Sequence, residues 1–316
     1  MPEVSIIVPN YNHAAFLQQR IDSILNQTYQ DFELIILDDC STDNSRDILE
    51  SLRNHPKVSH LIFNKKNSGS PFKQWQRGIE LAKGDYIWIA ESDDYCDHTF
   101  LETALENLNK GDSSLSFCQS ERVDENNIIT GDYFYWTEDI KTIDWSKQFV
   151  MNGEVFIQEV LQYKNAIPNA SAVLFRIKKF DFNKIVNYKM KGDWLFWITF
   201  LMSENLTYSP GKLNFFRSHP DTTRNQWSNL IAVRSSIEEL GIKYFLYKSG
   251  FVKSQQLKEA FYKSVDISLP YYGEFKKICF ELALPSSFQF YFFLRKVWLK
   301  LLRTIPSGKP GNSNKY

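Results

Sequence analysis

Three carboxylate residues, Glu91, Asp93 and Asp94, lie within four positions directly after the apolar segment 86–90. Neighbouring negative charges repel one another, so such a cluster either stays solvated in a turn or holds a cation. Magnesium and manganese prefer hard oxygen ligands and often take only one or two protein carboxylates. The cluster therefore predicts a divalent metal site, with Asp93 and Asp94 as the ligands. The alternative is a solvated turn before a helix that begins at Thr99.

Two further polar strings stand at the ends of apolar segments. PNYN, residues 9–12, closes the segment 4–9, and DDCSTD, residues 38–43, closes the segment 32–39. The carboxyl ends of neighbouring parallel strands meet at one edge of a sheet, where α/β proteins bind their ligands. We therefore expect these strings and the carboxylate cluster to form one site.

The elements that must position these strings alternate regularly over the first third of the chain. The expected strands are 4–9, 32–39, 58–63 and 85–90, and the expected helices between them are 15–27, 45–54 and 72–83. Alternation of this kind predicts an α/β fold, in which helices cover both faces of a mainly parallel sheet.

The rest of the chain predicts three more strands and then a helical extension. Strands are expected at 114–119, 170–177 and 206–217, an aromatic helix at 193–204, and four helices at 229–248, 253–266, 271–283 and 286–304. We expect a catalytic domain over 1–225 and a helical extension over 226–305. The composition of 306–316 is that of a disordered tail.

The charge balance, the cysteines and the lack of a long apolar segment limit what kind of protein this can be. Lys plus Arg and Asp plus Glu both total 37 in 316 residues, and this balance lacks the basic excess of a nucleic-acid binder. The four cysteines are scattered without metal-site spacing, which predicts reduced thiols. Neither a signal peptide nor a membrane-spanning segment is evident, so a cytoplasmic protein is expected.

The segment 286–304 differs in kind from the other helices. It combines many aromatic and leucine residues with Arg295, Lys296, Lys300 and Arg303, and no acidic residue follows Glu281. This composition suits a helix that lies in a membrane interface beside anionic lipids, which would place the protein peripherally on the inner face. The alternative is a helix that packs on the rest of the protein with its cations at the surface.

Several motifs in register resemble those of one enzyme family. They are PNYN, QTYQDFELIILDDCSTDNS, the NSG segment followed by KGDYI, and ESDD. Over residues 2–225 the chain resembles family 2 inverting glycosyltransferases of the bacterial surface-polysaccharide type. The resemblance implies the GT-A fold, a Rossmann-like mixed sheet, and a Mn²⁺ or Mg²⁺ cofactor.

The resemblance also implies how a nucleotide-sugar donor binds. Asp39 would accept a hydrogen bond from the base, which suits uracil or thymine, and Pro9 and Tyr11 would line the base. Lys73 and Arg77 are four residues apart on one helix face, where either can reach a phosphate or point to solvent. Asp94 would ligate the metal and Asp93 would lie beside the ribose.

Two further residues gain roles from the resemblance. Asp193 matches the general base of the family, although Gly192 stands before it where the family often has Glu. The acidic cluster departs in a similar way, because Glu91 stands where the family usually has Asp. His219, in an Arg-x-His string, would be a metal ligand or hold the diphosphate.

The function expected from these residues is transfer of a sugar from a UDP- or dTDP-linked donor to a saccharide or lipid-linked saccharide. Two other functions remain open. A sugar nucleotidyltransferase would also use an α/β sheet and acidic metal ligands, and a glycosyltransferase-like module could bind without turnover.

Overall fold

The computed structural model describes residues 1–220 and 228–304, with side chains placed up to residue 296. Within these residues the chain divides into two compact units, one formed by 1–220 with 248–251 and the other by 228–247 with 252–304. The predicted boundary at 225 and the predicted tail 306–316 both lie outside the described residues.

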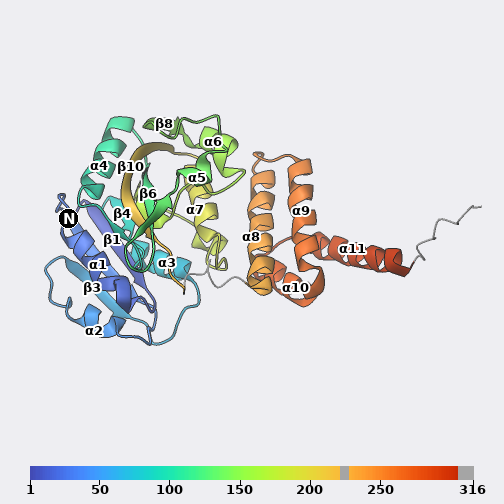
Figure 1. Cartoon of the computed structure of the whole chain (residues 1–316), viewed down its shortest axis with the longest axis horizontal. Coiled ribbons are helices and arrows are strands. Elements are labelled where there is room, and N and C mark those ends of the chain that lie inside the picture. The colour runs from blue at the N-terminus through green and yellow to red at the C-terminus, as the bar shows by residue number, and fades with distance from the viewer. Residues whose placement is uncertain (221–227, 305–316) are drawn as a thin grey trace, which may run out of the picture. The chain divides into compact units, whose positions relative to one another are not determined.

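The first unit is built around one mixed sheet (Figure 1). Its order is β3-β2-β1-β4-β9-β6-β10-β5, with β7 paired to β6 and β8 to β10. The strands are β1 Val4–Asn10, β2 Phe32–Asp38, β3 Val58–Phe63, β4 Tyr86–Ile89, β5 Tyr95–Cys96, β6 Leu115–Val123, β7 Ile129–Asp132, β8 Phe149–Asn152, β9 Val173–Arg176 and β10 Asn205–Arg217. Strands β1 to β4 pair in parallel, as predicted, whereas β9 pairs antiparallel to both β4 and β6. The carboxyl ends of β1, β2 and β4 therefore lie along one edge.

Helices connect and cover these strands. They are α1 Ala14–Leu25, α2 Ser45–Glu50, α3 Pro71–Leu81, α4 Phe100–Gly111, α5 Phe134–Thr137, α6 Gly153–Phe156 and α7 Gly192–Leu201, with short turns η1 Ile157–Leu161, η2 Ala170–Ala172 and η3 Phe182–Lys184. The predicted helix over 45–54 ends at Glu50, four residues early. The elements between β6 and β9, which include β7, β8, α5 and α6, were not predicted, because each is only four residues long.

The alternation of β1 side chains explains how helices cover both faces. Val4, Ile6 and Val8 pack in one core cluster with apolar residues of α1 and α4. Ile7 points to the opposite face, where Gly78 of α3 lies so close that a Cβ there would stand 2.4 Å from Ile7 Cγ2. Glycine at position 78 is therefore what allows α3 to approach the sheet.

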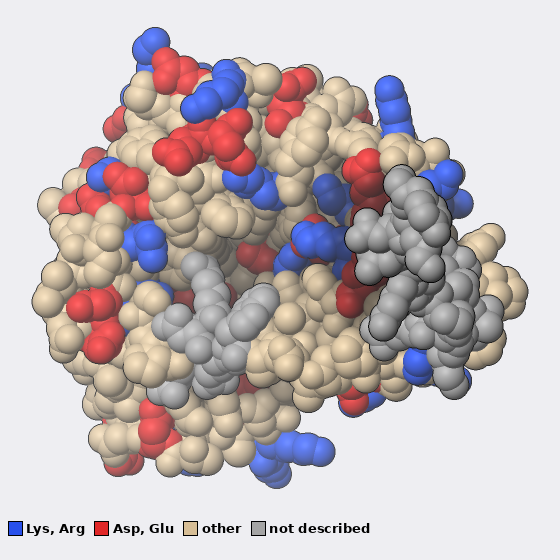
Figure 2. Space-filling model, turned by 45° about the vertical axis from the view of Figure 1, so that its right-hand side comes forward, with Lys and Arg blue, Asp and Glu red and all other residues tan. Residues whose placement is uncertain are grey.

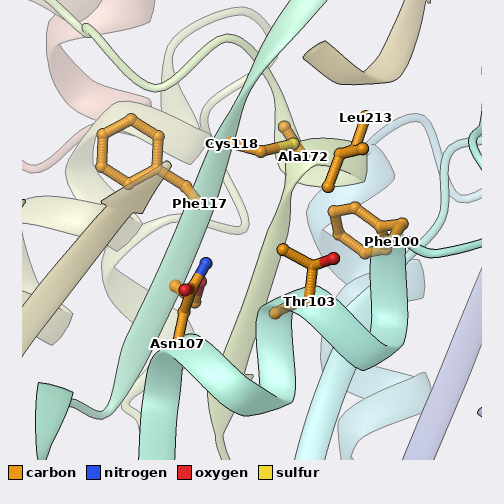
Figure 3. Close-up of a pocket in the computed structure, with 9 residues that line it drawn as sticks. Phe100, Thr103, Asn107, Phe117, Cys118, Ala172 and Leu213 are labelled. Atoms are coloured by element: carbon orange, nitrogen blue, oxygen red, sulfur yellow. The ribbon is translucent and has the colours of Figure 1, made fainter. Parts of the chain in front are cut away.

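A small cavity lies under α4, lined by residues of that helix and of β6 (Figure 3). Its volume is about 10 Å³, and Phe100, Phe117 and Leu213 make its wall largely apolar. This is the space of about one water molecule, so the cavity is a packing defect rather than a ligand site.

The second unit is helical, as predicted. Its elements are α8 Asn229–Lys248, α9 Ser254–Ser268, η4 Leu269–Tyr271, α10 Tyr272–Glu281 and α11 Ser286–Thr304. Apolar residues of all four α-helices form one core, in which Phe292 of α11 is fully buried. Arg234 pairs with the buried carboxylate of Glu238 at 2.8 Å and with Glu281 at 2.6 Å, so the charge buried there is compensated.

Helix α11 both packs and presents an exposed face. Phe288 and Phe292 join the core of the second unit, and Arg295 forms an ion pair with Asp266 at 2.9 Å. Four large apolar side chains of the same helix are exposed: Phe290, Tyr291, Phe293 and Leu294. Packing within the unit is therefore confirmed for the first part of α11, and contact with a membrane stays a prediction.

Three whole-chain expectations can be compared with the structure. The four cysteines are free thiols, as predicted. Among the described residues, no helix has both the length and the apolar character needed to cross a membrane. Acidic and basic side chains are interspersed over the face seen in Figure 2, in line with the balanced composition.

Candidate active site

Strands β1 and β2 end side by side and their loops are tied together. Asn10 and Asp38 are paired in register, and Asn10 Nδ2 donates to Asp38 Oδ1 at 2.8 Å. Asn12 takes a positive φ of 57°, and its side chain accepts from Thr42 N at 2.7 Å. Ser41 Oγ donates to Asp38 Oδ1 and accepts from Asn12 N. Asp38 and Asn12 therefore shape the loops.

Asp39, predicted to recognise the base, is buried and its carboxylate is already hydrogen-bonded. Oδ1 accepts from Asn64 Nδ2 at 2.6 Å and from Gln74 Nε2 at 2.9 Å, and Oδ2 accepts from Ser68 Oγ at 2.7 Å. Ser68 N donates to both oxygens. A carboxylate accepts about four hydrogen bonds. Asp39 therefore fixes the segment 64–74, and a base could take its hydrogen bond only if one of these donors moved.

The other residues predicted to bind the donor surround this corner. Pro9 is buried within β1, and Tyr11 is exposed just beyond its end. Lys73 Nζ donates to Ser68 O at 3.0 Å, and Arg77 Nη1 donates to Asn64 Oδ1. Both cations of α3 thus lie against the segment that Asp39 holds.

The carboxylate cluster follows β4, as predicted, and its three members have different surroundings. Glu91 accepts a hydrogen bond from Trp75 Nε1 of α3 at 3.0 Å. Asp94 is buried, with Oδ1 accepting from Arg217 N at 3.0 Å and Oδ2 from Asn169 Nδ2. The longer side chain of Glu91 is what allows it to reach Trp75.

Asp93 lies between two histidines. His219 Nε2 is 3.4 Å from Asp93 Oδ2, and His13 Nδ1 is 4.0 Å from Asp93 Oδ1. One ligand atom from each of the three residues lies within 4.8 Å of the other two, which is close enough for one metal ion. Asp93 and His219 are thus together, as predicted, but Asp94 is not part of this group.

The pKa values separate the three carboxylates. Burial, reinforced by Asp93 and Asp94, raises the pKa of Glu91 to about 8. Burial and then Asp93 raise the pKa of Asp94 to about 7. Burial would also raise the pKa of Asp93, but His13 and His219 outweigh it and lower that pKa to about 2. Of the three carboxylates, Asp93, which faces the histidines, is the one whose surroundings favour the ionised form.

The donor set of His13, Asp93 and His219 fits a divalent metal. A carboxylate is the ligand that Mg²⁺ and Mn²⁺ prefer, and imidazole suits transition metals better than Mg²⁺. A low pKa keeps Asp93 ionised, as a metal ligand must be. The residues present therefore suit Mn²⁺ better than Mg²⁺.

Arg217 holds this corner together. Its buried guanidinium donates to the backbone oxygens of Asp93 at 2.7 Å and Asp124 at 2.9 Å. It also lies over the rings of Phe16 and Tyr95, at 4.6 and 5.3 Å from their centroids. The Arg in the Arg-x-His string therefore fixes the loop that carries Asp93 and sets where His219 leaves β10.

Asp193 is the second residue of α7 and its side chain is partly exposed. Asn165 Nδ2 donates to Asp193 Oδ2 at 2.9 Å. Gly192 packs against Phe72, because a Cβ at 192 would lie 2.4 Å from the Cε2 atom of that ring. The Glu that the motif resemblance led us to expect at this position would not fit this packing, so Gly192 is explained by the position of Phe72.

The segment 165–169 links the two acidic positions. Its first residue, Asn165, bonds Asp193, and its last, Asn169, bonds Asp94. Asn169 Oδ1 also accepts from Asn214 Nδ2 of β10 at 3.1 Å. The metal corner and the proposed base are therefore joined by one short segment of chain.

Comparison with known proteins identifies the family. The model for "Glycosyl transferase family 2" matches residues 5–183, more than half of the chain. The chain belongs to glycosyl transferase family 2. The family inferred from the motifs is thereby confirmed.

Curated proteins of similar sequence include two bacterial glycosyltransferases. Glycosyltransferase GlyG of Streptococcus pneumoniae is 33% identical over 161 residues, covering 50% of this chain and 46% of GlyG. The putative teichuronic acid biosynthesis glycosyltransferase TuaG of Bacillus subtilis is 34% identical over 116 residues, 37% of this chain and 46% of TuaG. The match spans less than half the length of each.

Solved structures share the fold. TarS 1-349 from S. aureus, in complex with UDP, superposes with a TM-score of 0.55 at 16% identity, over 94% of this chain and 91% of that one. The mannosyltransferase PcManGT from Pyrobaculum calidifontis, with GDP-Man and Mn²⁺, gives 0.53 at 14% identity, over 96% and 81%. The GT-A fold expected from the motifs is confirmed.

Four residues of this family 2 site were not predicted. His13 directly follows the PNYN string, and the adjacency of β1 and β4 was the signal that could have placed it beside Asp93. Asn165, Asn169 and Arg217 act through side-chain contacts to distant residues, and no local pattern marks the two asparagines.

Proposed function

We propose that this protein is a metal-dependent inverting glycosyltransferase that uses a UDP- or dTDP-linked sugar. The acceptor is a saccharide or lipid-linked saccharide of a bacterial surface polymer. The observation that carries the proposal is the placement of Asp93 between two histidines, together with a partly exposed Asp193 that residues 165–169 connect to Asp94, the neighbour of Asp93. One corner suits a diphosphate and its metal, and the other suits an acceptor hydroxyl.

Asp93, His13 and His219 would hold the metal. When bound, a divalent cation stabilises the negative charge of a departing diphosphate. Asp94 takes a different role from the one first expected. Its oxygens accept from Arg217 N and Asn169, so it positions the loop rather than contributing a ligand.

Asp193 acts as the general base. It accepts the proton of the acceptor hydroxyl while that oxygen forms a bond to the anomeric carbon and the bond from this carbon to the diphosphate breaks. Attack from the face opposite the leaving group inverts the anomeric configuration. Asn165 orients the carboxylate through Oδ2, and the partial exposure of Asp193 leaves it accessible to an acceptor.

Donor binding falls to the corner formed by β1, β2 and α3. Pro9 and Tyr11 would line the base, Asp39 would contact it after exchanging one of its donors, and Lys73 or Arg77 would face the diphosphate. The TarS structure with UDP-GlcNAc supports a uridine donor, whereas PcManGT, of the same fold, was solved with GDP-Man. The base therefore needs a direct test.

The exposed face of α11 would place the enzyme at the inner surface of the membrane. Phe290, Tyr291, Phe293 and Leu294 supply apolar area, and Lys296 supplies a cation at the same helix. The catalytic domain of this proposal is 1–225, and 226–305 is its helical extension.

A binding panel tests the donor and the metal together. UDP-, dTDP-, GDP- and ADP-sugars are titrated by calorimetry into the full chain, with and without Mn²⁺. The proposal predicts binding of the pyrimidine nucleotides that strengthens with Mn²⁺. Binding of none of them, or equal affinity with and without Mn²⁺, would contradict it.

A further inference from the structure

An aromatic pair on α5 lies exposed near Asp193 and takes no part in the metal or donor corners. Tyr135 is 47% exposed and Trp136 is 39% exposed, with ring centroids 6.3 Å apart. Large aromatic side chains normally lose most of their exposure when a protein folds. Two neighbouring ones that stay exposed offer ring surface to a ligand.

The Trp136 indole is held in place by residues at its edges. Nε1 donates to Asn165 O at 2.7 Å, and Lys164 Nζ lies 4.8 Å from the ring centroid. Lys164 Nζ in turn donates to Trp136 O at 2.7 Å and to Asp139 Oδ1 at 2.6 Å. The ring is therefore fixed and its polar atom is satisfied, while much of its apolar surface stays open to solvent.

The same asparagine ties this ring to the proposed base. Asn165 O accepts from Trp136, and Asn165 Nδ2 donates to Asp193 Oδ2 at 2.9 Å. Since the carbonyl oxygen and side-chain nitrogen of one asparagine lie at most about 6 Å apart, the indole nitrogen lies within about 12 Å of the Asp193 carboxylate. One or two sugar rings span such a distance.

We propose that Tyr135 and Trp136 form an acceptor subsite that stacks a sugar ring of the saccharide whose hydroxyl faces Asp193. The apolar C–H face of a pyranose suits an open aromatic face. Arg122, which lies 5.0 Å from the Tyr135 ring centroid, and the Lys164–Asp139 pair supply polar groups for its hydroxyls. The proposal rests on the proposed function, since it places the subsite beside the general base. It assigns the acceptor as a saccharide with one ring on the aromatic pair and a hydroxyl of that ring or of the next one at Asp193.

The test compares saccharide binding with nucleotide binding in the full chain. An array of bacterial surface oligosaccharides is probed with the wild-type protein, Trp136→Ala, Trp136→Phe and a control, Tyr247→Ala. The control removes a ring of the second unit that is 41% exposed. The best ligand and UDP with Mn²⁺ are then titrated by calorimetry. Loss of one stacking face in Trp136→Ala should weaken saccharide binding by about 5- to 100-fold. Trp136→Phe, which keeps a ring, should retain most of it. UDP affinity should be unchanged in all variants, and Tyr247→Ala should match the wild type.

Three results would overturn the subsite. The first is a wild type that binds no saccharide on the array, and the second is a Trp136→Ala variant with unchanged saccharide affinity. The third is a parallel loss of saccharide and UDP affinity in Trp136→Ala, which would mean that the ring only supports the fold. If the wild type binds a saccharide but no nucleotide, the proposed function fails while the saccharide site stands.

Discussion

Substitution Gly192→Ala tests the packing that places Asp193. A methyl group at 192 would lie 2.4 Å from Phe72 Cε2 and 2.6 Å from its Cζ, far inside van der Waals contact. Phe72 cannot easily turn away, because it is buried and packs edge-on against Trp75 with centroids 5.1 Å apart. Overpacking of this kind costs about 1–3 kcal/mol. Alanine regains at most about 1 kcal/mol of helix propensity. At the middle of these two ranges the free energy of unfolding should fall by about 1.5 kcal/mol.

The assay is urea unfolding of the full chain, followed by near-ultraviolet circular dichroism of the aromatic cluster. Gly273→Ala is the matched control, since Gly273 lies in α10 and a methyl group there would meet no atom within 4 Å, so it should be neutral or stabilising. In a Phe72→Leu background the smaller side chain makes room, so Gly192→Ala should cost at least about 0.5 kcal/mol less than in the wild type. A Gly192→Ala protein as stable as the wild type would show that Phe72 does not require glycine at position 192.

Three further predictions concern the metal, the donor and the membrane. Asp93→Asn should weaken Mn²⁺ binding by at least about 10-fold in electron paramagnetic resonance titrations, and by more than Asp94→Asn does, because Asp94 only positions the loop. The reverse order would mean that Asp94 is a metal ligand. Asp39→Ala should cost about 1.5–3 kcal/mol of UDP binding measured by calorimetry, and equal loss of GDP binding would show that it acts only by holding 64–74. Replacing both Phe290 and Phe293 by Glu should release the protein from anionic vesicles in a sedimentation assay. The melting temperature should not fall, because both rings are exposed. Retention on the vesicles would contradict the membrane contact.

The positions of the four parallel strands in the sequence could be predicted, because each strand has a local apolar pattern. Val4 to Val8 and Phe32 to Leu37 are apolar apart from Ser5 and Glu33, and their polar ends mark where the loops of the site begin. The same logic placed Asp93 at the end of β4. The helices of the second unit were predictable for a similar reason, because the helical spacing of their apolar residues continues over long segments.

Contacts between distant residues could not be predicted in this way. The split between Asp93 and Asp94 depends on Arg217 N and Asn169, which reach the cluster from 123 and 75 residues away. In the sequence, Gly192 is only a departure from the family pattern, and its reason is found in the structure, where Phe72 packs directly against it. Trp136 carries no signal in the sequence, because its exposure and its bond to Asn165 arise only in the fold.

The measurement that tests the central claim most directly is a comparison of binding and turnover in Asp193→Asn. Asn has nearly the shape of Asp but cannot take the acceptor proton, and Asp193, the proposed base, lies outside the group of His13, Asp93 and His219. UDP and Mn²⁺ affinities should therefore stay near wild type, while turnover falls by about 10²- to 10⁴-fold, as expected for loss of a general base. Thermal melts control for an effect on the start of α7. Near wild-type transfer by a variant that binds donor normally would contradict the account, because the base would then lie elsewhere.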